Sequence, residues 1–302
     1  MTNNQTTYSA HGKFLITGEY AILAGVPGLA IPLRLGQQMS VTPREDATIN
    51  WKSHDADGSI WFESTFSTNL ESVPKDCAVT TKLKQILKTG LSLSGNNHFN
   101  CGYDVITTLD FHRAFGMGTS STLIAMVAAW LECDSYALQF ACFGGSGYDI
   151  ACATAHMPII YTFDALKPIV NFVDFKPSFS DQLFFVYLNR KQNSRESIAR
   201  FDKSLLTATV VEELTAMPEA LLKSATNFEQ FKSLLTRHES IIADLISLEP
   251  IQRSFPDFNG VLKSLGGWGG DFILAVGSDA PAYFKSHGYD VVLRWDEVIL
   301  QS

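Results

Sequence analysis

Residues 115–128 read FGMGTSSTLIAMVA, a loop of glycines and hydroxyl residues that runs directly into an apolar helical segment. Gly116 and Gly118 carry no side chain that would keep an anion away from the backbone. The first turn of the helix presents unpaired N–H groups and the positive end of the helix dipole. Three hydroxyl residues follow Gly118, namely Thr119, Ser120 and Ser121. The stretch predicts a phosphate-binding loop, with a hydroxyl-capped buried helix as the alternative, because Ser and Thr are common N-cap residues.

The neighbouring segments support the phosphate interpretation. Residues 102–110 (GYDVITTLD) have a β-like pattern, so the loop stands at a strand-to-helix junction. Residues 144–149 (GGSGYD) form a second glycine-rich turn, which presents the carboxylate of Asp149 before another small-residue segment. The strand-to-helix context of the first loop strengthens the phosphate interpretation.

The first part of the chain is mostly β. Residues 13–17 (KFLIT) predict a short strand that begins at Lys13, and residues 50–62 alternate around the turn signal at 55–58, which predicts a hairpin. Residues 79–93 place their leucines and isoleucine at helical spacing, with lysines on the other face, so this segment predicts a helix.

The second part mixes strands and helices. Residues 164–180 are rich in Pro, Phe and Asp and predict a passage between two domains, 1–178 and 179–302. Beyond it we expect a buried strand at 182–188, and amphipathic helices at 205–222 and 228–248 that are broken near Pro218. The polar loop 189–197 (NRKQNSRES) carries three cationic side chains and is a candidate anion contact, with a solvated loop as the alternative.

Composition excludes several classes of protein. The formal net charge of −8 provides no basic field for a nucleic acid, and no stretch approaches the ~20 apolar residues of a membrane span. The N-terminus lacks the basic start and apolar core of a secretory signal, so we expect a cytoplasmic protein. The chain has five cysteines and no C-x-x-C pair, so we expect neither a zinc site nor disulfide bonds.

Four segments in this order resemble the motifs of the GHMP small-molecule kinases, a family that includes galactokinase, homoserine kinase, mevalonate kinase and phosphomevalonate kinase. They are HGKFLITGEYAILAGVPGLA at 11–30 (the first motif), GMGTSST at 116–122 (the second motif), GGSGYDIA at 144–151 (the segment that carries the catalytic aspartate in the family) and GGWGGDFILAV at 266–276 (the third motif). The wording G-Y-D-I-A is similar to a bacterial subgroup near the mevalonate kinases, whereas GEYAIL favours phosphomevalonate kinases. The resemblance implies an α+β fold of two domains, an N-terminal domain like domain 2 of ribosomal protein S5 and a ferredoxin-like C-terminal domain.

The resemblance also implies roles for individual residues. Gly116, Gly118, Thr119, Ser120 and Ser121 would bind ATP, and the Ser120 hydroxyl would bind Mg²⁺. Asp149 would accept the proton of the substrate alcohol, with Lys13 as the cation that keeps this carboxylate ionised. The acceptor substrate would contact residues of the first motif, the polar loop and the third motif, namely Glu19, Tyr20, Ser194, Arg195, Gly267 and Gly269. For Lys13 and Asp149 the alternatives are a solvated lysine and a turn residue.

Two departures from the family pattern affect the predicted site. Mevalonate kinases carry a metal-binding glutamate where this chain has Gln139, whose neutral amide is a poorer Mg²⁺ ligand. The phosphate loop is preceded by Arg113, Ala114 and Phe115 instead of the usual Pro and extra Gly, so the start of the loop is bulkier and carries a cation. Arg113 is either a phosphate contact or a surface arginine.

The sequence therefore predicts an ATP- and Mg²⁺-dependent kinase that phosphorylates an alcohol of a small metabolite, with mevalonate as the first candidate. Phosphomevalonate kinase is the alternative enzyme. A catalytically silent protein of this fold, which binds a metabolite after its metal site has decayed, is the alternative of another class. We expect neither a nucleic acid nor a membrane as partner, and the sequence makes no prediction of the oligomeric state.

Overall fold

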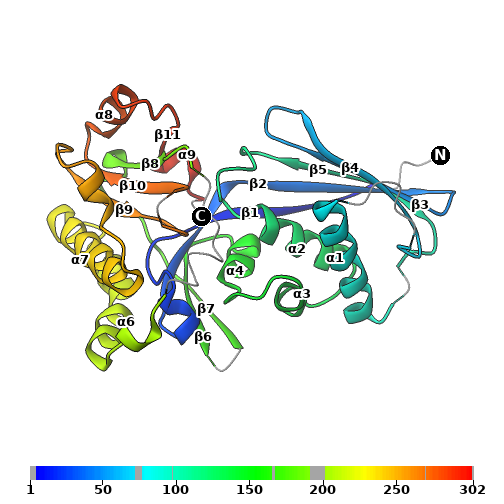
Figure 1. Cartoon of the computed structure of the whole chain (residues 1–302), viewed down its shortest axis with the longest axis horizontal. Coiled ribbons are helices and arrows are strands. Elements are labelled where there is room, and N and C mark those ends of the chain that lie inside the picture. Colours follow the sequence, from blue (N-terminus) through cyan, green and yellow to red (C-terminus); the bar gives the residue numbers. More distant parts are fainter. Residues whose placement is uncertain are drawn as a thin grey trace. The chain divides into compact units, whose positions relative to one another are not determined.

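The computed structural model describes residues 5–71, 77–96, 98–164, 167–190, 201–268 and 270–300. Backbone contacts divide the chain into two compact units (Figure 1). Unit 1 comprises residues 1–12, 35–113 and 117–154, and unit 2 comprises residues 13–34, 114–116 and 155–302. The sequence places a domain boundary at residue 178, whereas the contacts assign three separate segments to each unit.

Unit 1 contains most of a mixed sheet, in which some strands pair antiparallel and others pair in parallel. Strands β1 (Thr6–Leu15) and β2 (Gly28–Arg44) run through both units, and β2 pairs antiparallel with β5 (Gly102–Leu109) over residues 37–44. Strand β5 pairs in parallel with β3 (Thr48–His54), which pairs antiparallel with β4 (Ile60–Ser67). The predicted hairpin is confirmed, and Gly58 turns its tip with a φ of 82°.

Four helices cover one face of this sheet in unit 1 (Figure 1). They are α1 (Ala78–Ser94), α2 (Thr119–Trp130), α3 (Ser135–Cys142) and α4 (Tyr148–Thr154). The helix predicted at 79–93 is confirmed: Leu83, Ile86 and Leu87 of α1 are buried against sheet residues such as Trp51 and Phe66. Helix α2 packs against α1, α3 and α4, so the predicted phosphate loop ends at the start of the central helix of this layer.

Unit 2 contains the segments of the chain that return beside β2. Strand β6 (Ile159–Asp164) pairs with β2 over residues 28–30, and β7 (Lys167–Phe172) pairs with β6. The segment 164–180, expected to be a passage between domains, therefore contains a strand of unit 2. Ile169 and Phe172 are exposed because β7 is at the edge of the sheet, which makes the strand difficult to recognise from its sequence.

A four-stranded antiparallel sheet forms the rest of the core of unit 2. Its strand order is β11 (Val292–Arg294), β8 (Leu183–Tyr187), β10 (Phe272–Val276) and β9 (Val261–Ser264). The longer helices are α6 (Ala208–Lys223) and α7 (Phe228–Ile246), and the shorter ones are η1 (Ala21–Ala24), η2 (Ser180–Gln182), η3 (Lys203–Leu205), η4 (Ile251–Ser254), α8 (Ala280–Ser286) and α9 (Trp295–Val298).

Helix α6 corrects one expectation from the sequence, because it continues through Pro218 without ending. A proline inside a helix removes a hydrogen bond and costs about 3 kcal/mol. Pro218 is buried with its neighbours Leu214, Met217 and Leu221, and α6 packs along α7. Burial of this face stabilises the helix enough to retain the proline.

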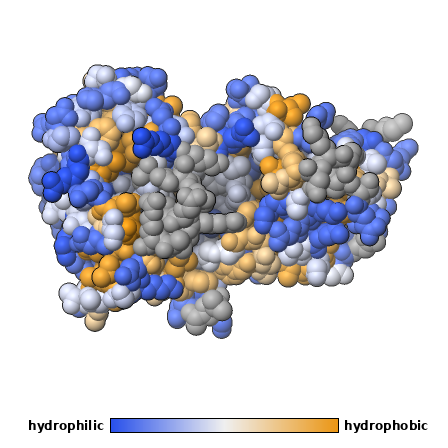
Figure 2. Space-filling view, in the orientation of Figure 1, coloured by the Kyte–Doolittle hydropathy of each residue, from blue (hydrophilic) through white to orange (hydrophobic). Residues whose placement is uncertain are grey.

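The surface is mixed in character. On the face shown in Figure 2, hydrophobic residues form several separate areas among hydrophilic ones. The large exposed hydrophobic side chains lie on different elements, for example Ile60 on β4, Leu93 on α1 and Phe172 on β7. In the described part of the chain, no helix combines the length and the hydrophobicity needed to cross a membrane.

Candidate functional site

Helix α2 starts at a glycine, and one hydroxyl group of its first turn is exposed. Gly118 is the N-cap with a φ of 107°, a left-handed conformation that favours glycine. The Ser121 hydroxyl donates to the Gly118 carbonyl at 2.8 Å and is buried. Ser120 is exposed, and within the residues that the structure describes its hydroxyl has no hydrogen-bond partner. Among the described residues no side chain caps the N-terminus of α2, which leaves the N–H groups of its first turn to an anion.

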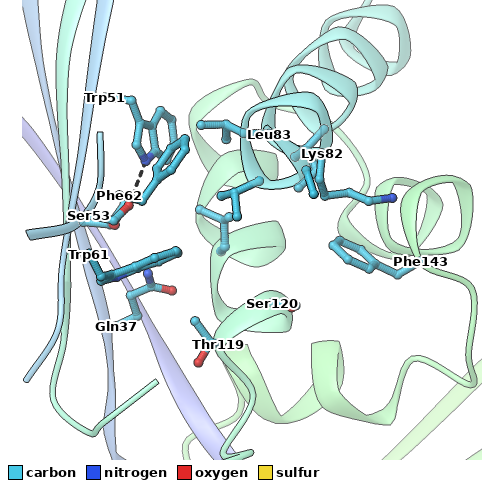
Figure 3. A pocket seen from close by; sticks show the side chains of 15 residues that line it. Gln37, Trp51, Ser53, Trp61, Phe62, Lys82, Leu83, Thr119, Ser120 and Phe143 are labelled. Carbon is cyan, nitrogen blue, oxygen red and sulfur yellow. Dashed lines mark hydrogen bonds between the residues drawn. The ribbon is translucent and has the colours of Figure 1, made fainter. Parts of the chain in front are cut away.

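An aromatic pocket of about 300 Å³ adjoins this helix start in unit 1 (Figure 3). Trp51, Trp61 and Phe62 from the β3–β4 hairpin form one wall, and helix α1 forms the opposite one. Thr119 and Ser120 line it from α2. A concave, largely apolar space with a few polar groups is the usual form of a small-molecule site.

Hydrogen bonds hold the polar side chains Gln37 and Ser53 of the pocket in place. The Thr122 hydroxyl donates to Gln37 Oε1 at 2.7 Å, which leaves the Gln37 amide N–H group as the remaining donor of that side chain. Ser53 Oγ accepts from Trp51 Nε1 at 3.1 Å and from the Thr107 hydroxyl at 2.9 Å. These bonds fix the wall beside Trp61.

Asp149 and Gln139 lie on the helices that pack around α2. Asp149 occupies the first turn of α4, which follows the positive-φ glycines Gly144, Gly145 and Gly147. Gln139 on α3 is buried, and its Nε2 donates to the Gly144 carbonyl at 3.1 Å. Its Oε1 is buried without a hydrogen-bond partner among the described residues. Gln139 therefore holds the glycine turn that leads to Asp149 and retains one unused oxygen.

Lys13 and Gly116 meet in unit 2. Lys13 Nζ donates to the Gly116 carbonyl at 3.3 Å. Gly116 has a φ of 68°, and a Cβ there would lie 2.5 Å from an oxygen of Asp271. Phe115 packs on Tyr187 with ring centroids 4.7 Å apart, so it is a packing residue of unit 2. Burial and the charge of Asp271 raise the pKa of Tyr187, whose hydroxyl donates to the Ala114 carbonyl at 3.4 Å.

Arg113 is engaged within unit 1. Its backbone N–H donates to Asp55 Oδ1 at 3.0 Å, its Nε lies 3.6 Å from Asp55 Oδ2, and its guanidinium covers the Trp61 ring at 5.1 Å. The side chain of Asp55 is 5% exposed. These contacts attach the end of the β3–β4 hairpin to the segment that leads into the phosphate loop.

The first-motif residues Glu19 and Tyr20 are both buried in unit 2. The carboxylate of Glu19 accepts from Lys263 Nζ and lies 3.4 Å from His238 Nε2. Tyr20 has a φ of 62°, unusual for an aromatic residue, and stacks on Phe201 at 6.0 Å. The buried contacts of Glu19 are not evident from the sequence.

The third motif lies after strand β9. Gly266 has a φ of 61°, Gly267 is buried, and the adjacent Trp268 packs into the cluster that includes Tyr20 and residues of α7. Ser194, Arg195 and Gly269, three of the predicted substrate contacts, lie outside the described residues.

Three features of this region were not predicted from the sequence. Trp51 and Trp61 suggest an ordinary hairpin core by their alternation, and only the adjacent helix shows that they bound a pocket. Asp271 lies within the third motif, directly before strand β10, and its carboxylate lies beside Gly116. Lys263 and His238 stand 244 and 220 residues from their partners in the first motif.

Comparisons with known proteins rest on structure. No sequence profile of a known family matches the chain, and no curated protein matches it in sequence. Among solved structures, mevalonate kinase from Methanococcus jannaschii is similar with a TM-score of 0.72 at 13% identity, and the match covers 100% of both chains. Phosphomevalonate kinase from Streptococcus pneumoniae, in complex with phosphomevalonate and AMPPNP, gives 0.69 at 16% identity over 98% of each chain. Galactokinase from Lactococcus lactis, in complex with galactose, gives 0.68 at 13% identity over 97% of this chain and 94% of the other. The protein therefore has the α+β fold of the GHMP kinases along its whole length.

Proposed function

We propose that the protein is an ATP-dependent phosphotransferase that phosphorylates an alcohol group of a small metabolite, with mevalonate as the first candidate. The observation that carries this proposal is the pairing, within unit 1, of an aromatic pocket with the uncapped glycine start of α2. A nucleotide needs both parts, an apolar space for the base and backbone N–H groups for the phosphates. The fold shared with kinases that act on small molecules supports the same reaction class.

The nucleotide would bind with its base between the hairpin wall and helix α1. Trp51, Trp61 and Phe62 offer aromatic surfaces for the base (Figure 3). Its phosphates would lie on the phosphate loop, which comprises Gly116, Gly118, Thr119, Ser120 and Ser121. Ser120 is the hydroxyl of this set that faces solvent, whereas Ser121 supports the loop from inside.

Two oxygen groups of unit 1 would contribute to a magnesium site in which the ion is held mainly by the nucleotide. Mg²⁺ usually keeps few protein ligands beside the substrate phosphates, and it requires oxygen ligands. The exposed Ser120 hydroxyl and the unpartnered Gln139 Oε1 are such oxygens. The described residues contain no group of three His, Cys, Asp or Glu side chains that could hold a metal. When bound, the ion would offset the charge that develops on the transferred phosphoryl group.

Asp149 and Lys13 are the proposed catalytic residues. Asp149 would accept the proton of the substrate alcohol. The alcohol oxygen then forms a bond to the γ-phosphorus of ATP while the bond between this phosphorus and ADP breaks. Lys13 would keep that carboxylate ionised and offset the charge of the phosphoryl group. The acceptor would be bound at the first motif by the turn that carries Glu19 and Tyr20, at the third motif by Gly267 and Gly269, and at the polar loop by Ser194 and Arg195.

Phosphomevalonate kinase is the second candidate enzyme. Glu19 is followed by Tyr20 where relatives of the mevalonate kinase type have histidine, and this wording favours a phosphorylated acceptor. In that reaction the attacking group is a phosphate oxygen, so a strong proton acceptor at residue 149 is less necessary. The catalytically silent alternative is supported by Gln139, which replaces a metal-binding carboxylate.

A turnover screen separates these candidates. Purified protein is assayed for ADP release with ATP, Mg²⁺ and one of mevalonate, phosphomevalonate, homoserine or galactose. We expect turnover with mevalonate, and Asp149→Asn should lower kcat by about 10²–10⁴-fold, because general base catalysis contributes this much. The same substitution at Asp134, the N-cap of α3, is the control and should retain kcat.

Each other outcome of the screen points to one alternative. Turnover with phosphomevalonate alone selects the second candidate enzyme. Binding of ATP in a thermal shift assay, without dependence on Mg²⁺ and without turnover of any acceptor, selects the silent protein.

A further inference from the structure

A buried set of charged residues joins three distant parts of unit 2. Glu19 is 1% exposed, Lys263 and His238 are both fully buried, and Glu239 is 2% exposed. Glu19 precedes η1, Lys263 lies on β9, and His238 and Glu239 lie on α7. Burial of charged groups is unfavourable unless they are paired and hydrogen-bonded, so the pairing within this set decides its protonation.

Lys263 and Glu239 form the satisfied part of the set. Lys263 Nζ donates to Glu19 Oε1 and to the Ser264 carbonyl at 2.6 Å. Glu239 accepts from the Ser264 N–H at 2.9 Å, from the Ser264 hydroxyl at 2.8 Å and from the Ile251 N–H at 3.0 Å. The set offers one cationic side chain, Lys263, to two carboxyl groups, so with Lys263 and Glu239 charged an ionised Glu19 would leave it with a net negative charge.

On the other side of Glu19 the described residues place an acceptor, His238 Nε2, and no proton donor. His238 Nε2 accepts from the Gly18 N–H at 3.0 Å, so this nitrogen carries no hydrogen and the ring is neutral. The same nitrogen lies 3.4 Å from Glu19 Oε2, which has no hydrogen-bond partner among the described residues. Two buried acceptors that face each other repel, and an unpaired carboxylate oxygen is costly. A proton on Oε2 removes the charge of the unpaired oxygen and places a hydrogen, in place of a lone pair, opposite Nε2.

The turn that carries Glu19 is held in an unusual conformation. A Cβ at Gly18 would lie 2.8 Å from Gly28 Cα, and Gly18 has a φ of 92°. Tyr20 has a φ of 62° and a ψ of −48°. Such conformations persist only where surrounding contacts enforce them. The contacts from His238 to Gly18 and from Lys263 to Glu19 flank this turn on both sides.

We propose that Glu19 is protonated in the folded protein and that Glu19, His238 and Lys263 are positioning residues, which fix the turn of residues 18–20 against the acceptor substrate. The placement of this turn at the acceptor rests on the proposed function, whereas the buried proton does not.

The environment of Glu19 agrees with this assignment. Burial raises the pKa of Glu19 to about 7, although Lys263 acts in the opposite direction. Burial and the charge of Lys263 hold the pKa of His238 well below its usual range, so the proton resides on the carboxyl group. Lys263, His238 and Glu239 are the titratable groups that face Glu19 in the described part of unit 2.

The sign of the pH dependence follows from the raised pKa. Below about pH 4.5, the ordinary value for this group, Glu19 is protonated in both the folded and the unfolded chain. Between that value and about 7 only the folded state holds the proton, so the stability associated with Glu19 falls as pH rises. Above this range the loss is complete.

Comparison of the wild-type protein with Glu19→Gln tests the proton directly. Gln has the shape of a protonated Glu but does not titrate in this range. Denaturant unfolding at pH 5 to 8 gives the folding equilibrium constant of each protein. The ratio of the wild-type constant to the Glu19→Gln constant should fall about tenfold per pH unit as the pH rises to 7, and should then stay constant. A ratio independent of pH would overturn the proposal, because Glu19 would then be ionised throughout.

The control is Glu213→Gln. Glu213 on α6 pairs with Arg237 Nε at 2.5 Å near the surface, and this pairing lowers the pKa of Glu213. The ratio of the wild-type folding equilibrium constant to that of Glu213→Gln should not change between pH 5 and 7. Should Glu19→Gln not fold, the ¹³C shift of the Glu19 side-chain carboxyl in the wild-type protein gives the same answer: it should titrate near pH 7, and titration near pH 4.5 would overturn the proposal.

The positioning role has its own readout. In the wild type, KM for the acceptor should rise above pH 7 as the proton is lost, whereas in Glu19→Gln the acceptor KM should not follow this titration. An acceptor KM that titrates equally in both proteins would exclude the positioning role. Absence of any kinase activity would refute the proposed function, and the unfolding experiment would still decide the protonation of Glu19.

Discussion

At the scale of single residues, the positions that matter most are those whose conformation leaves little choice of side chain. Gly116 combines a φ of 68° with an Asp271 carboxylate at the place where a Cβ would lie, and its carbonyl accepts from Lys13. One glycine therefore serves the backbone turn, the approach of Asp271 and the contact with Lys13. Ser120 and Gln139 each retain an unused oxygen among the described residues of unit 1, which makes them the residues to test for a role in metal binding.

Gly116→Ala should destabilise the protein more than Gly95→Ala does. Gly95, the C-cap of α1, has a φ of 70° with nothing near its missing Cβ, so alanine there has only the backbone cost of about 1–2 kcal/mol. At Gly116 the Asp271 carboxylate must also move, which adds about 1–3 kcal/mol. Urea unfolding measures both. Equal effects would show that Asp271 moves aside without cost.

At the scale of secondary-structure elements, the site in unit 1 is a product of three neighbours. The β3–β4 hairpin supplies the aromatic wall, α1 the opposite wall, and α2 the glycine start with its available N–H groups. The Thr122 hydroxyl, on the buried side of α2, ties this helix to Gln37 on β2. Each element is held by its neighbours, and these contacts define the space between them.

Val79→Trp on α1 should raise KM for ATP about tenfold or more without loss of stability. Val79 lines the pocket and is 41% exposed, so an indole can occupy part of the pocket without distorting the core. Leu93→Trp is the matched control, since Leu93 is 44% exposed on the same helix and does not line the pocket. Steady-state kinetics with varied ATP measures both variants. Equal KM values would place the nucleotide elsewhere.

At the scale of the whole molecule, contacts between residues far apart in the sequence hold the first motif in place. The set formed by Glu19, His238, Glu239 and Lys263 connects the turn before η1 with α7 and β9, and buries every one of these polar side chains. The chain has a hydrophobic core here as well, in which Tyr20 and Trp268 pack against residues of α7. The motif is therefore positioned by the fold of unit 2 more than by its own local sequence.

Lys263→Met should destabilise the protein by about 3–5 kcal/mol at pH 8, because it leaves the remaining members of a buried ionic set uncompensated. The effect should be smaller at pH 6, where Glu19 carries its proton. Adding Glu19→Gln to Lys263→Met should restore part of the loss at pH 8, since the double variant has no carboxylate at residue 19. Denaturant unfolding of the four proteins in this double-mutant cycle gives the coupling. Additive effects at pH 8 would show that the two side chains do not interact.

The sequence by itself determined the local features of this protein. Alternation around a turn signal predicted the hairpin, helical spacing predicted α1, and the run of Gly, Ser and Thr predicted the start of α2, because each depends on neighbours within a few residues. The order of four glycine-rich motifs indicated the GHMP kinase fold, which the structural comparisons confirm. Lys13 and Asp149 remain predicted catalytic residues on the same basis.

Only the tertiary structure decided what lies around those motifs. Periodicity identifies which residues are buried but not what they face, so Trp51 and Trp61 became walls of a pocket only when α1 was placed opposite them. Local propensity breaks a helix at Pro218, yet burial against α7 keeps α6 continuous. Glu19 could not be paired with Lys263 from the sequence, because 244 residues separate them and the partner of a buried charge is chosen by the packing of strands and helices.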